Sequence, residues 1–420
     1  MSTSALDWMI SVDDHVIEPP TLWQDRLSGK DKDRGPRVVE EDGASYWVYE
    51  DVRMPINGEL AASGRDRSQV NPLPISYADM RPGYYDPEAR IEDMNADGIL
   101  AAMCFPMFPR FCGQTFAESK DHDFALTLIR IYNDWMIEDW CGSAPGRFIP
   151  LILVPLWDAG LAAAEAERCF AKGAKAIAFS ENPTKLGLPS IHDKSEYWRP
   201  LFQTANDTGM PICTHVGSSS DMPITSPDAP LLVMSALTPQ NISRCMVDWL
   251  YSGNFIKFPN LKLCLSEGGI GWIPHVLERC DHDVRRLVWA TDGDYRFDFE
   301  KNSAAVFDES GATDLGGKMP SELFREHVYG CFIEDYFGAE HIERIGVDNV
   351  MMESDYPHSD GSFPFTMKRA HEQLEGYSDE VKLKLLHGNA QRAFNFEAVD
   401  WSTIVGPSSK GLRASEPVSK

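Results

Sequence analysis

The stretch MISVDDHVIEP, residues 9–19, passes from an apolar run directly into Asp13 and His15, and this transition guides the interpretation of the whole chain. Four later apolar runs also end on a side chain that can bind a metal: KAIAFSE (175–181), PICTHVG (211–217), LKLCLSE (261–267) and NVMMESD (349–355). In a parallel α/β fold the carboxyl ends of the strands converge on one face, so distant positions can meet in one pocket. The series therefore predicts a parallel α/β fold with a metal centre at one end of its strands.

Composition and charge limit the classes of function that fit this chain. The 420 residues are 43% hydrophobic and 11% aromatic, which allows a large core and excludes global disorder. A formal net charge of −25 argues against nucleic acid as a partner, because phosphate binding requires clustered Lys and Arg. No apolar run approaches the roughly 20 residues that cross a bilayer, and we find no signal peptide. Nine scattered cysteines without CxxC pairs indicate a reduced chain, so we expect a cytoplasmic protein without a membrane partner.

Strand-like and helix-like segments alternate along most of the chain. Besides the five runs quoted above, we expect strands at 99–105, 148–154 and 327–332, and helices at 91–97, 124–140, 161–172, 198–208, 231–251, 272–290 and 379–394. This pattern gives roughly eight βα units, the number in a closed barrel. The predicted fold class is therefore α/β, a (β/α)8 TIM-type barrel that forms a single domain over residues 8–400.

Two segments interrupt or follow this alternation. Residues 21–80 are rich in turns, with EEDG at 40–43 and NPLP at 71–74. Because long irregular segments in compact proteins commonly carry function, we interpret 21–80 as a lid-like insertion after the first strand. Residues 403–420 include GPSS and lack apolar periodicity, which predicts a flexible C-terminal tail.

The first strand carries two side chains that can bind a metal together. Asp13 and His15 are two residues apart, so on a strand they point to the same face and offer a carboxylate and an imidazole. Taken alone, the pair is equally well explained by an aspartate that caps a turn beside a hydrogen-bonded histidine. Glu18, next to Pro19, is more simply a loop carboxylate than a group that supports the ligands.

Each side chain at the later strand ends can again be interpreted either as a metal ligand or as an ordinary polar residue. His215 ends a buried strand just before Gly217 and is a good ligand candidate. Glu267 follows a strongly apolar strand, where a carboxylate needs a partner. Glu181 alone is more commonly an exposed cap, and Asp355 ends the last run. Because the same coincidence would have to recur at five strand ends, a metal site is the better explanation.

Several motifs together resemble one known family. They are SVDDHVIEP (11–19), YNDW (132–135), GRFIP (146–150), THVG (214–217), EGGIGWIP (267–274), SDYPH (354–358) and GNA (388–390). With these motifs the chain resembles the amidohydrolase-related (amidohydrolase 2) family, the branch of the amidohydrolase superfamily that includes aminocarboxymuconate-semialdehyde decarboxylase and γ-resorcylate decarboxylase. The resemblance implies the barrel of the metal-dependent hydrolase superfamily, with ligands from strands 1, 5 and 8. Those positions are here Asp13, His15, His215 and Asp355.

The chain departs from the superfamily pattern in two places. The usual His-x-His of strand 1 is Asp13-x-His15, as in some decarboxylases of the family, and the histidine of strand 6 is replaced by Glu267. Glu181 stands at the strand-4 position that bridges two metals in the binuclear branch. His358 is either a third imidazole or a group that orients the neighbouring ligand. This set can hold one or two divalent ions, namely Zn, Mn or Fe.

The predicted function is that of a metal-dependent enzyme with a small-molecule substrate, in which Asp355, Glu267 and His215 are the catalytic residues. Hydrolysis of an amide and non-oxidative decarboxylation of a small organic acid use the same ligands, and both stay open. The carboxylates Glu181 and Glu267 keep a dinuclear iron-type oxygenase as an alternative, and a non-catalytic metal-binding subunit is a further one. We expect a homo-oligomer, or a hetero-oligomer with a related barrel subunit. Further candidates by position near strand ends are Arg110, Arg147 and His275.

Overall fold

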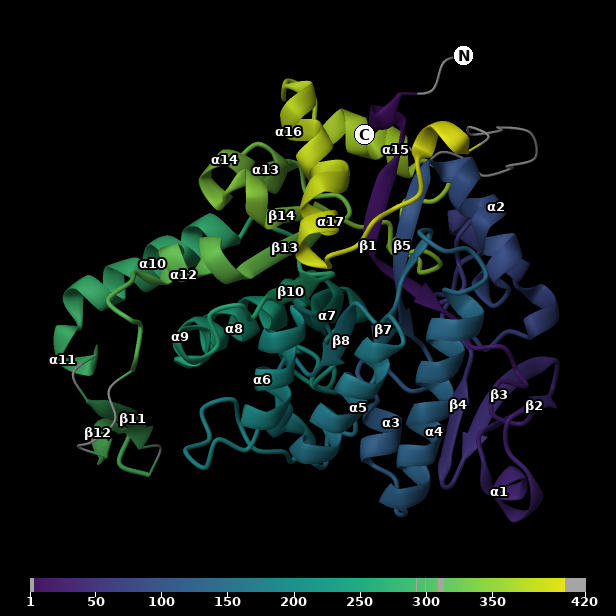
Figure 1. Cartoon of the computed structure of the whole chain (residues 1–420), viewed down its shortest axis with the longest axis horizontal. Coiled ribbons are helices and arrows are strands. Elements are labelled where there is room, and N and C mark those ends of the chain that lie inside the picture. The colour runs from purple at the N-terminus through teal and green to yellow at the C-terminus, as the bar shows by residue number, and fades with distance from the viewer. Residues whose placement is uncertain (1–3, 292, 299, 309–312, 405–420) are drawn as a thin grey trace.

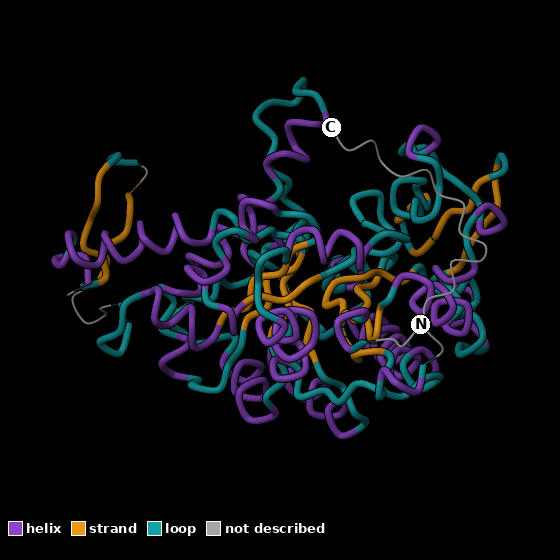
Figure 2. Tube along the Cα trace, turned by 90° about the horizontal axis from the view of Figure 1, so that it is seen from above, coloured by secondary structure: helices purple, strands orange, loops and turns teal. Residues whose placement is uncertain are grey.

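The structure, a computed structural model, describes residues 4–291, 293–298, 300–308 and 313–404. Parallel strands lie in the middle of the molecule with helices around them (Figure 2). The strands form two hydrogen-bonded groups, in the orders β1-β5-β6 and β14-β13-β10-β9-β8-β7. Their bounds are β1 Met9–Val16, β5 Ile99–Pro106, β6 Phe148–Ile149, β7 Leu151–Ile152, β8 Ala176–Phe179, β9 Ile212–His215, β10 Leu263–Ser266, β13 Val328–Phe332 and β14 Val350–Met352. This is the closed α/β barrel that the sequence predicts.

Two main-chain hydrogen bonds close the ring between its first and last strands. The nitrogen of Asp355 donates to the oxygen of Asp13 at 2.9 Å, and the nitrogen of His15 donates to the oxygen of Tyr356 at 2.6 Å. In the third strand, Pro150 separates β6 from β7, because proline has no N–H to donate to a ladder. The single strand expected at 148–154 is therefore two short pieces, one in each hydrogen-bonded group.

Helices follow the strands in chain order and cover the outside of the barrel (Figure 1). The start and end of α2 illustrate why they form where they do. Asp86 caps its first turn by accepting a hydrogen bond from the nitrogen of Ala89 at 2.9 Å, and Gly98 ends it with a φ of 77°. The bounds are α1 Gly29–Arg34, α2 Pro87–Asp97, α3 Gln114–Ala117, α4 His122–Asp134, α5 Ala159–Ala171, α6 Arg199–Thr208, α7 Leu231–Leu237, α8 Pro239–Leu250, α9 Asn254–Lys257, α10 Ile273–Arg286, α11 Val288–Thr291, α12 Pro320–His327, α13 Tyr336–Ala339, α14 Ile342–Ile345, α15 Thr366–Gln373, α16 Asp379–Leu383 and α17 Asn389–Ala393.

Residues 21–80 contain more regular structure than expected. An antiparallel sheet forms there from β2 Arg37–Glu41, β3 Ala44–Tyr49 and β4 Val52–Pro55. Asp42 and Gly43 make the two-residue turn between its first strands, with φ values of 51° and 78° that suit an Asp-Gly hairpin turn. Trp47 of β3 is fully buried and stacks on Phe108 with ring centroids 4.8 Å apart. The insertion is thus joined to the core, and its role as a lid stays a prediction.

Other elements differ from their expected bounds for local reasons. The helix expected at 231–251 is broken into α7 and α8, because Pro239 begins a new helix. After α10 and α11 the chain forms an antiparallel hairpin, β11 Asp294–Asp298 with β12 Ser303–Asp308, which stands away from the barrel in Figure 1. His327, the first residue of the strand expected at 327–332, instead ends α12 and is buried there, with its Nδ1 2.8 Å from the carbonyl oxygen of Leu261.

The cysteines and the hydropathy of the helices are two further features of the structure. All nine cysteines are free and buried, as expected for a chain without disulfides. Among the residues that the structure describes, no helix combines the length and the hydropathy of a membrane span. The predicted tail at 403–420 lies outside the described residues beyond Ile404.

Candidate metal centre

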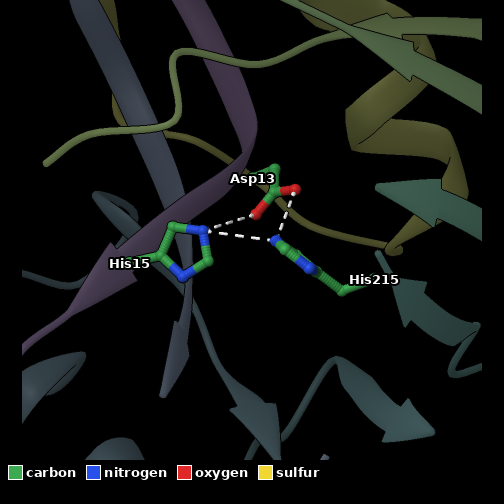
Figure 3. A group of neighbouring side chains, drawn as sticks. All are labelled: Asp13, His15 and His215. Atoms are coloured by element: carbon green, nitrogen blue, oxygen red, sulfur yellow. Dashed lines mark hydrogen bonds and ion pairs between the residues drawn. The ribbon is translucent and has the colours of Figure 1, made fainter. Parts of the chain in front are cut away.

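The end of β1 brings the first two predicted ligands together. Asp13 and His15 are both buried, at 0% and 1% exposure, and the Nε2 atom of His15 lies 3.6 Å from an oxygen of Asp13. Their side chains share one face of the strand, as the spacing of two residues predicts. Figure 3 shows both pointing toward a third side chain, His215.

His215, the last residue of β9, completes this first group of ligand candidates. Its Nε2 atom lies 3.4 Å from an oxygen of Asp13 and 3.3 Å from Nε2 of His15 (Figure 3). Its Nδ1 lies 2.6 Å from the carbonyl oxygen of Val216, so Nδ1 carries the proton and Nε2 presents its lone pair to the centre. Burial lowers the pKa of His215 to about 4, which keeps the ring neutral and able to bind a metal.

Asp355 enters the centre from the end of β14. It is buried, and its Oδ1 lies 3.2 Å from Nε2 of His15 and 3.0 Å from Nδ1 of His358. The two histidines stack with ring centroids 3.6 Å apart. Asp355, His15 and His358 form a second group of possible ligands, which shares His15 with the first group. The two groups together bring ligand candidates from strands 1, 5 and 8 to one place.

The donor set of the centre fits a divalent ion. The carboxylate oxygens of Asp13 and Asp355 are buried, and the charged or polar contacts that the described residues make with them all come from imidazole nitrogens, at 3.0 to 3.6 Å. Burial, followed by the nearby carboxylates of Glu353 and Asp355, raises the pKa of Asp13 well above its usual value. A buried carboxylate without a donor is costly, and a bound cation offsets this cost. Carboxylates with imidazoles suit Mn, Fe or Zn.

Glu267 borders the centre from the end of β10. Its Oε2 lies 3.2 Å from Nε2 of His215, its side chain is 26% exposed, and its backbone is left-handed with a φ of 56°. Burial and the charges of Asp355, Asp360 and Glu353 raise its pKa well above the usual value. Glu267 belongs to neither group of ligand candidates among the described residues.

Glu181 has its own set of hydrogen bonds at the mouth of β8. Its Oε1 accepts from the nitrogen of Gly217 at 3.1 Å, from the hydroxyl of Ser219 at 2.7 Å and from the amide of Asn241 at 3.3 Å. Its Oε2 is buried without a partner among the described residues. Glu181 therefore fixes the loop that follows His215, and only one of its oxygens is left for another ligand.

A cavity of about 780 Å³ lies beside the centre. Glu267 and Glu353 line it from the ends of β10 and β14, Arg67 lines it from the insertion, and Arg369 lines it from α15. Because Glu267 also contacts His215, the cavity and the metal centre share a wall. A small molecule in this cavity would therefore contact Glu267, which borders the centre.

A family model described as amidohydrolase matches residues 44–396, which is most of the chain. The chain belongs to the amidohydrolase family. A γ-resorcylate decarboxylase of Polaromonas sp. (strain JS666) is 25% identical to this amidohydrolase over 282 residues, which cover 65% of this chain and 78% of the relative. A 2-amino-3-carboxymuconate-6-semialdehyde decarboxylase of Dictyostelium discoideum is 22% identical over 359 residues, which cover 84% and 86%.

Solved structures share the fold of this amidohydrolase at low sequence identity. An amidohydrolase from Mycobacterium avium subsp. paratuberculosis K-10 matches with a TM-score of 0.67 and 22% identity, over 92% of this chain and 97% of that one. A dihydroxybenzoic acid decarboxylase from Polaromonas sp. JS666, with bound manganese and the inhibitor 2-nitroresorcinol, matches with a TM-score of 0.54 and 19% identity, again over 92% and 97%. The family resemblance and the barrel predicted from the sequence are confirmed.

Sequence reasoning missed two residues that fix the backbone around the predicted ligands. Asp14 points away from the centre and accepts hydrogen bonds from the hydroxyls of Ser11 at 2.7 Å and Ser354 at 2.5 Å. Buried Arg90 lies 3.6 Å from Asp14 and donates to the carbonyl oxygen of His15 at 2.6 Å. Because side chains alternate along a strand, Asp14 is predicted to point to the face opposite to that of Asp13 and His15. Its partners come from distant segments, so no sequence signal identifies them.

Glu18 supports the centre indirectly and is not a simple loop carboxylate. It is fully buried and accepts hydrogen bonds from the nitrogens of Met107 at 3.0 Å and Phe108 at 2.9 Å. These bonds hold the loop that carries Phe111, whose ring stacks on His215 at a centroid distance of 4.0 Å. Burial raises the pKa of Glu18 to about 7.

The three remaining candidates lie away from the ligands. Arg147 donates to the carbonyl oxygens of Ile99 and Leu100, at the opposite end of β5 from the centre. Arg110 pairs with Glu118 at 3.0 Å. His275 on α10 lines a separate cavity and belongs to neither group of ligand candidates. None of the three contacts the centre in the described part of the chain.

Proposed function

We propose that this amidohydrolase is a metal-dependent decarboxylase that removes carbon dioxide from a small carboxylic acid without an oxidant. The observation that carries the proposal is the convergence of two carboxylates and two imidazoles in one buried centre, where the carboxylate oxygens are contacted by imidazole nitrogens and by no Lys or Arg of the described residues. Relatives named as decarboxylases of γ-resorcylate and of 2-amino-3-carboxymuconate-6-semialdehyde support this reaction over hydrolysis.

The ligands in this proposal come from three strands of the barrel. The residues that would hold one divalent ion are Asp13, His15, His215 and Asp355. A bound divalent ion supplies positive charge that attracts the substrate carboxylate and stabilises the negative charge that develops as carbon dioxide leaves. His358 orients the centre through its contact with Asp355 and its stacking on His15.

Glu267 is the residue that we assign to proton transfer. Loss of carbon dioxide leaves an electron pair on the carbon that carried the carboxylate, and that carbon must take up a proton. Glu267 lines the cavity and contacts His215, so its carboxyl group lies between the substrate space and the metal centre. It gives its proton to the carbon and regains one from water in the cavity.

Aromatic rings on the other side of His215 favour decarboxylation over hydrolysis. Phe111 stacks on the imidazole at 4.0 Å, and the ring of Phe105 packs edge-on at 5.0 Å. These rings exclude water from that side of His215, whereas hydrolysis needs a water molecule as the nucleophile. An apolar wall also strengthens the electrostatic interactions that assist loss of carbon dioxide.

The dinuclear oxygenase is the second candidate, and one observation favours it. Oε2 of Glu181 is buried without a partner among the described residues, as expected for an oxygen atom that binds a cation. A second ion would need this atom, because Oε1 of Glu181 already accepts several hydrogen bonds. Metal content and oxygen consumption separate the two candidates.

The test uses the full chain purified without chelators and loaded with Mn²⁺, Zn²⁺ or Fe²⁺. Hydroxylated benzoic acids and unsaturated dicarboxylic acids are supplied as substrates, and carbon dioxide and oxygen are measured together. We expect one carbon dioxide per product, no oxygen uptake, and no turnover in the His215→Ala variant. Turnover of amides or esters without carbon dioxide release would establish a hydrolase, and stoichiometric oxygen uptake would establish the oxygenase. Metal binding without any turnover would favour the non-catalytic subunit.

A further inference from the structure

A second cavity, of about 390 Å³, lies among the outer helices, where α10 contacts α12 and α14 (Figure 1). Its volume is in the range of roughly 300–1,000 Å³ that is typical of small-molecule sites. None of the described residues that line it belongs to the metal centre or lines the first cavity. Its charged and titratable side chains are five basic ones and two acidic ones: His275, Arg285, Arg325, His341 and Arg344 against Glu278 and Asp281.

The three arginines of this cavity come from three different helices. Arg285 lies in the last turn of α10, Arg325 in the last turn of α12 and Arg344 in the last turn of α14. None of them forms an ion pair with another residue that the structure describes. The chain has 64 acidic residues against 39 lysines and arginines, so carboxylates are in excess. A shortage of carboxylates therefore does not explain three arginines without ion pairs around one cavity.

The position of each arginine at a helix end has an ordinary explanation of its own. A cation in the last turn of a helix interacts favourably with the free carbonyl groups there. That interaction acts at each helix end separately and does not require the three side chains to line one space. Like charges that share a space repel each other, and a bound anion relieves this repulsion.

The acidic side chains of the cavity do not neutralise the arginines. Asp281 accepts two hydrogen bonds from Ser321, one from its main-chain nitrogen at 3.0 Å and one from its hydroxyl at 2.8 Å. Glu278 is exposed and forms no ion pair with the described residues. The cavity therefore has a net positive charge even when both of its histidines are neutral.

An aromatic ring beside the arginines indicates what kind of anion fits. Phe337 lines the cavity and is 64% exposed, and its ring centroid lies 4.5 Å from that of His341. Nδ1 of His341 lies 2.7 Å from the carbonyl oxygen of Phe337, which fixes the imidazole next to the ring. Guanidinium groups bind phosphate oxygens through paired hydrogen bonds, and an exposed ring can pack against the carbon part of a ligand.

We propose that this cavity binds a phosphate group, free or as the ester of a small organic molecule, through Arg285, Arg325 and Arg344. Phosphate suits three guanidinium groups better than a carboxylate does, because it carries more charge and more acceptor oxygens. The neighbouring residues Trp272 and Tyr336 line the cavity beside the metal centre, so the two cavities share segments of the chain. The inference does not depend on the proposed function.

The binding experiment uses phenyl phosphate and inorganic phosphate as probes. Each is titrated calorimetrically into the full-length, metal-loaded protein after unbound metal has been removed, in a buffer without other multivalent anions. We expect one phenyl phosphate to bind per chain, and to bind more tightly than inorganic phosphate because its ring can pack against Phe337. Equal affinities of the two probes would identify free phosphate as the ligand and would still support the site.

Variants of the cavity should change the affinity for phenyl phosphate in opposite directions. Arg325→Gln and Arg344→Gln should each weaken binding roughly tenfold, because each removes a charged donor. Glu278→Gln should strengthen binding, because it removes a charge that repels the anion. The matched control is Arg279→Gln, also on α10, which should leave the affinity unchanged because Arg279 pairs with Asp283 at 3.1 Å and does not line the cavity.

The results that would overturn the inference are distinct from those that bear on the decarboxylase. If the wild type shows no saturable binding, or if both arginine variants bind like the wild type, the cavity holds no phosphate. His215→Ala, which should retain no metal, is expected to bind phenyl phosphate like the wild type. Loss of binding in this variant would mean that the probe sits on the metal, and the inference would again be wrong. If one arginine variant does not fold, the other one and Glu278→Gln still decide the question.

Discussion

The imidazole of His358 stacks on that of His15 with ring centroids 3.6 Å apart, and both rings contact the same carboxylate, Asp355. The arrangement gives His358 two ways to affect the centre, through the orientation of Asp355 and through packing against His15. A residue that acts in this way alters metal affinity without being indispensable for it.

We therefore expect His358→Asn to weaken metal binding by roughly 10- to 100-fold while the protein still binds one ion at saturating metal. Titration of the metal-free protein with Mn²⁺ measures the change. An unchanged affinity would show that His358 neither binds nor orients the ion, and complete loss of binding would make it an essential ligand.

His215→Ala should abolish metal retention and leave the fold intact. The variant removes the Nε2 atom that lies 3.4 Å from Asp13, whereas the barrel core does not depend on one side chain at the end of β9. Metal analysis after dialysis, with circular dichroism as the check on folding, measures both effects. The matched control is His282→Ala, a substitution of an exposed histidine on α10 that should retain the ion. Retention of wild-type metal content by His215→Ala would refute its role as a ligand.

Glu181→Ala should lower stability by about 1–3 kcal/mol, because the donors of Gly217, Ser219 and Asn241 lose their shared acceptor. Metal content should stay the same if Glu181 serves only the loop. Glu181→Gln keeps an acceptor oxygen and is the control for the stability effect. A drop in metal content in both variants would instead support the two-ion centre and the oxygenase.

Asp97→Asn should change how stability depends on pH. Burial raises the pKa of Asp97 to about 7 against the opposing hydrogen bonds of Thr366, so the folded protein holds a proton that the unfolded chain releases near pH 4. The wild type should lose a few kcal/mol relative to the variant as the pH rises from about 4 to about 7. Urea unfolding at several pH values measures this difference. A difference that is constant across this range would show that Asp97 ionises normally in the folded protein.

The strand ends were predictable from the sequence because strand periodicity and the convergence of parallel strands are local and topological rules. Asp13, His15, His215 and Asp355 meet as these rules require. The turn at residues 40–43 was predicted, but the two strands that it joins into a hairpin were not, although Asp-Gly followed by alternating buried residues is a local signal.

Contacts between distant segments were beyond such rules. Glu353 belongs to the run NVMMESD (349–355), in which the sequence pointed only to Asp355. Its closeness to Glu267 depends on how β10 and β14 are placed around the ring. The role of Arg90 could not be predicted from the sequence either, because its partners Asp14 and His15 lie about 75 residues earlier in the chain. The expected oligomer and the expected cytoplasmic location are not properties of a single folded chain, and both stay predictions.

The hydrogen bond that joins Asp355 to Asp13 has a consequence for the biogenesis of the enzyme. The proposed ligands span the chain from residue 13 to residue 355, so an ion has no complete set of ligands until the last barrel strand has docked against the first. Metal uptake would therefore follow closure of the barrel and could not nucleate folding of the nascent chain. Once bound, the ion would act as a cross-link between the two ends of the domain. Hydrogen exchange along β1 and β14 should then slow more on metal loading than exchange along β8.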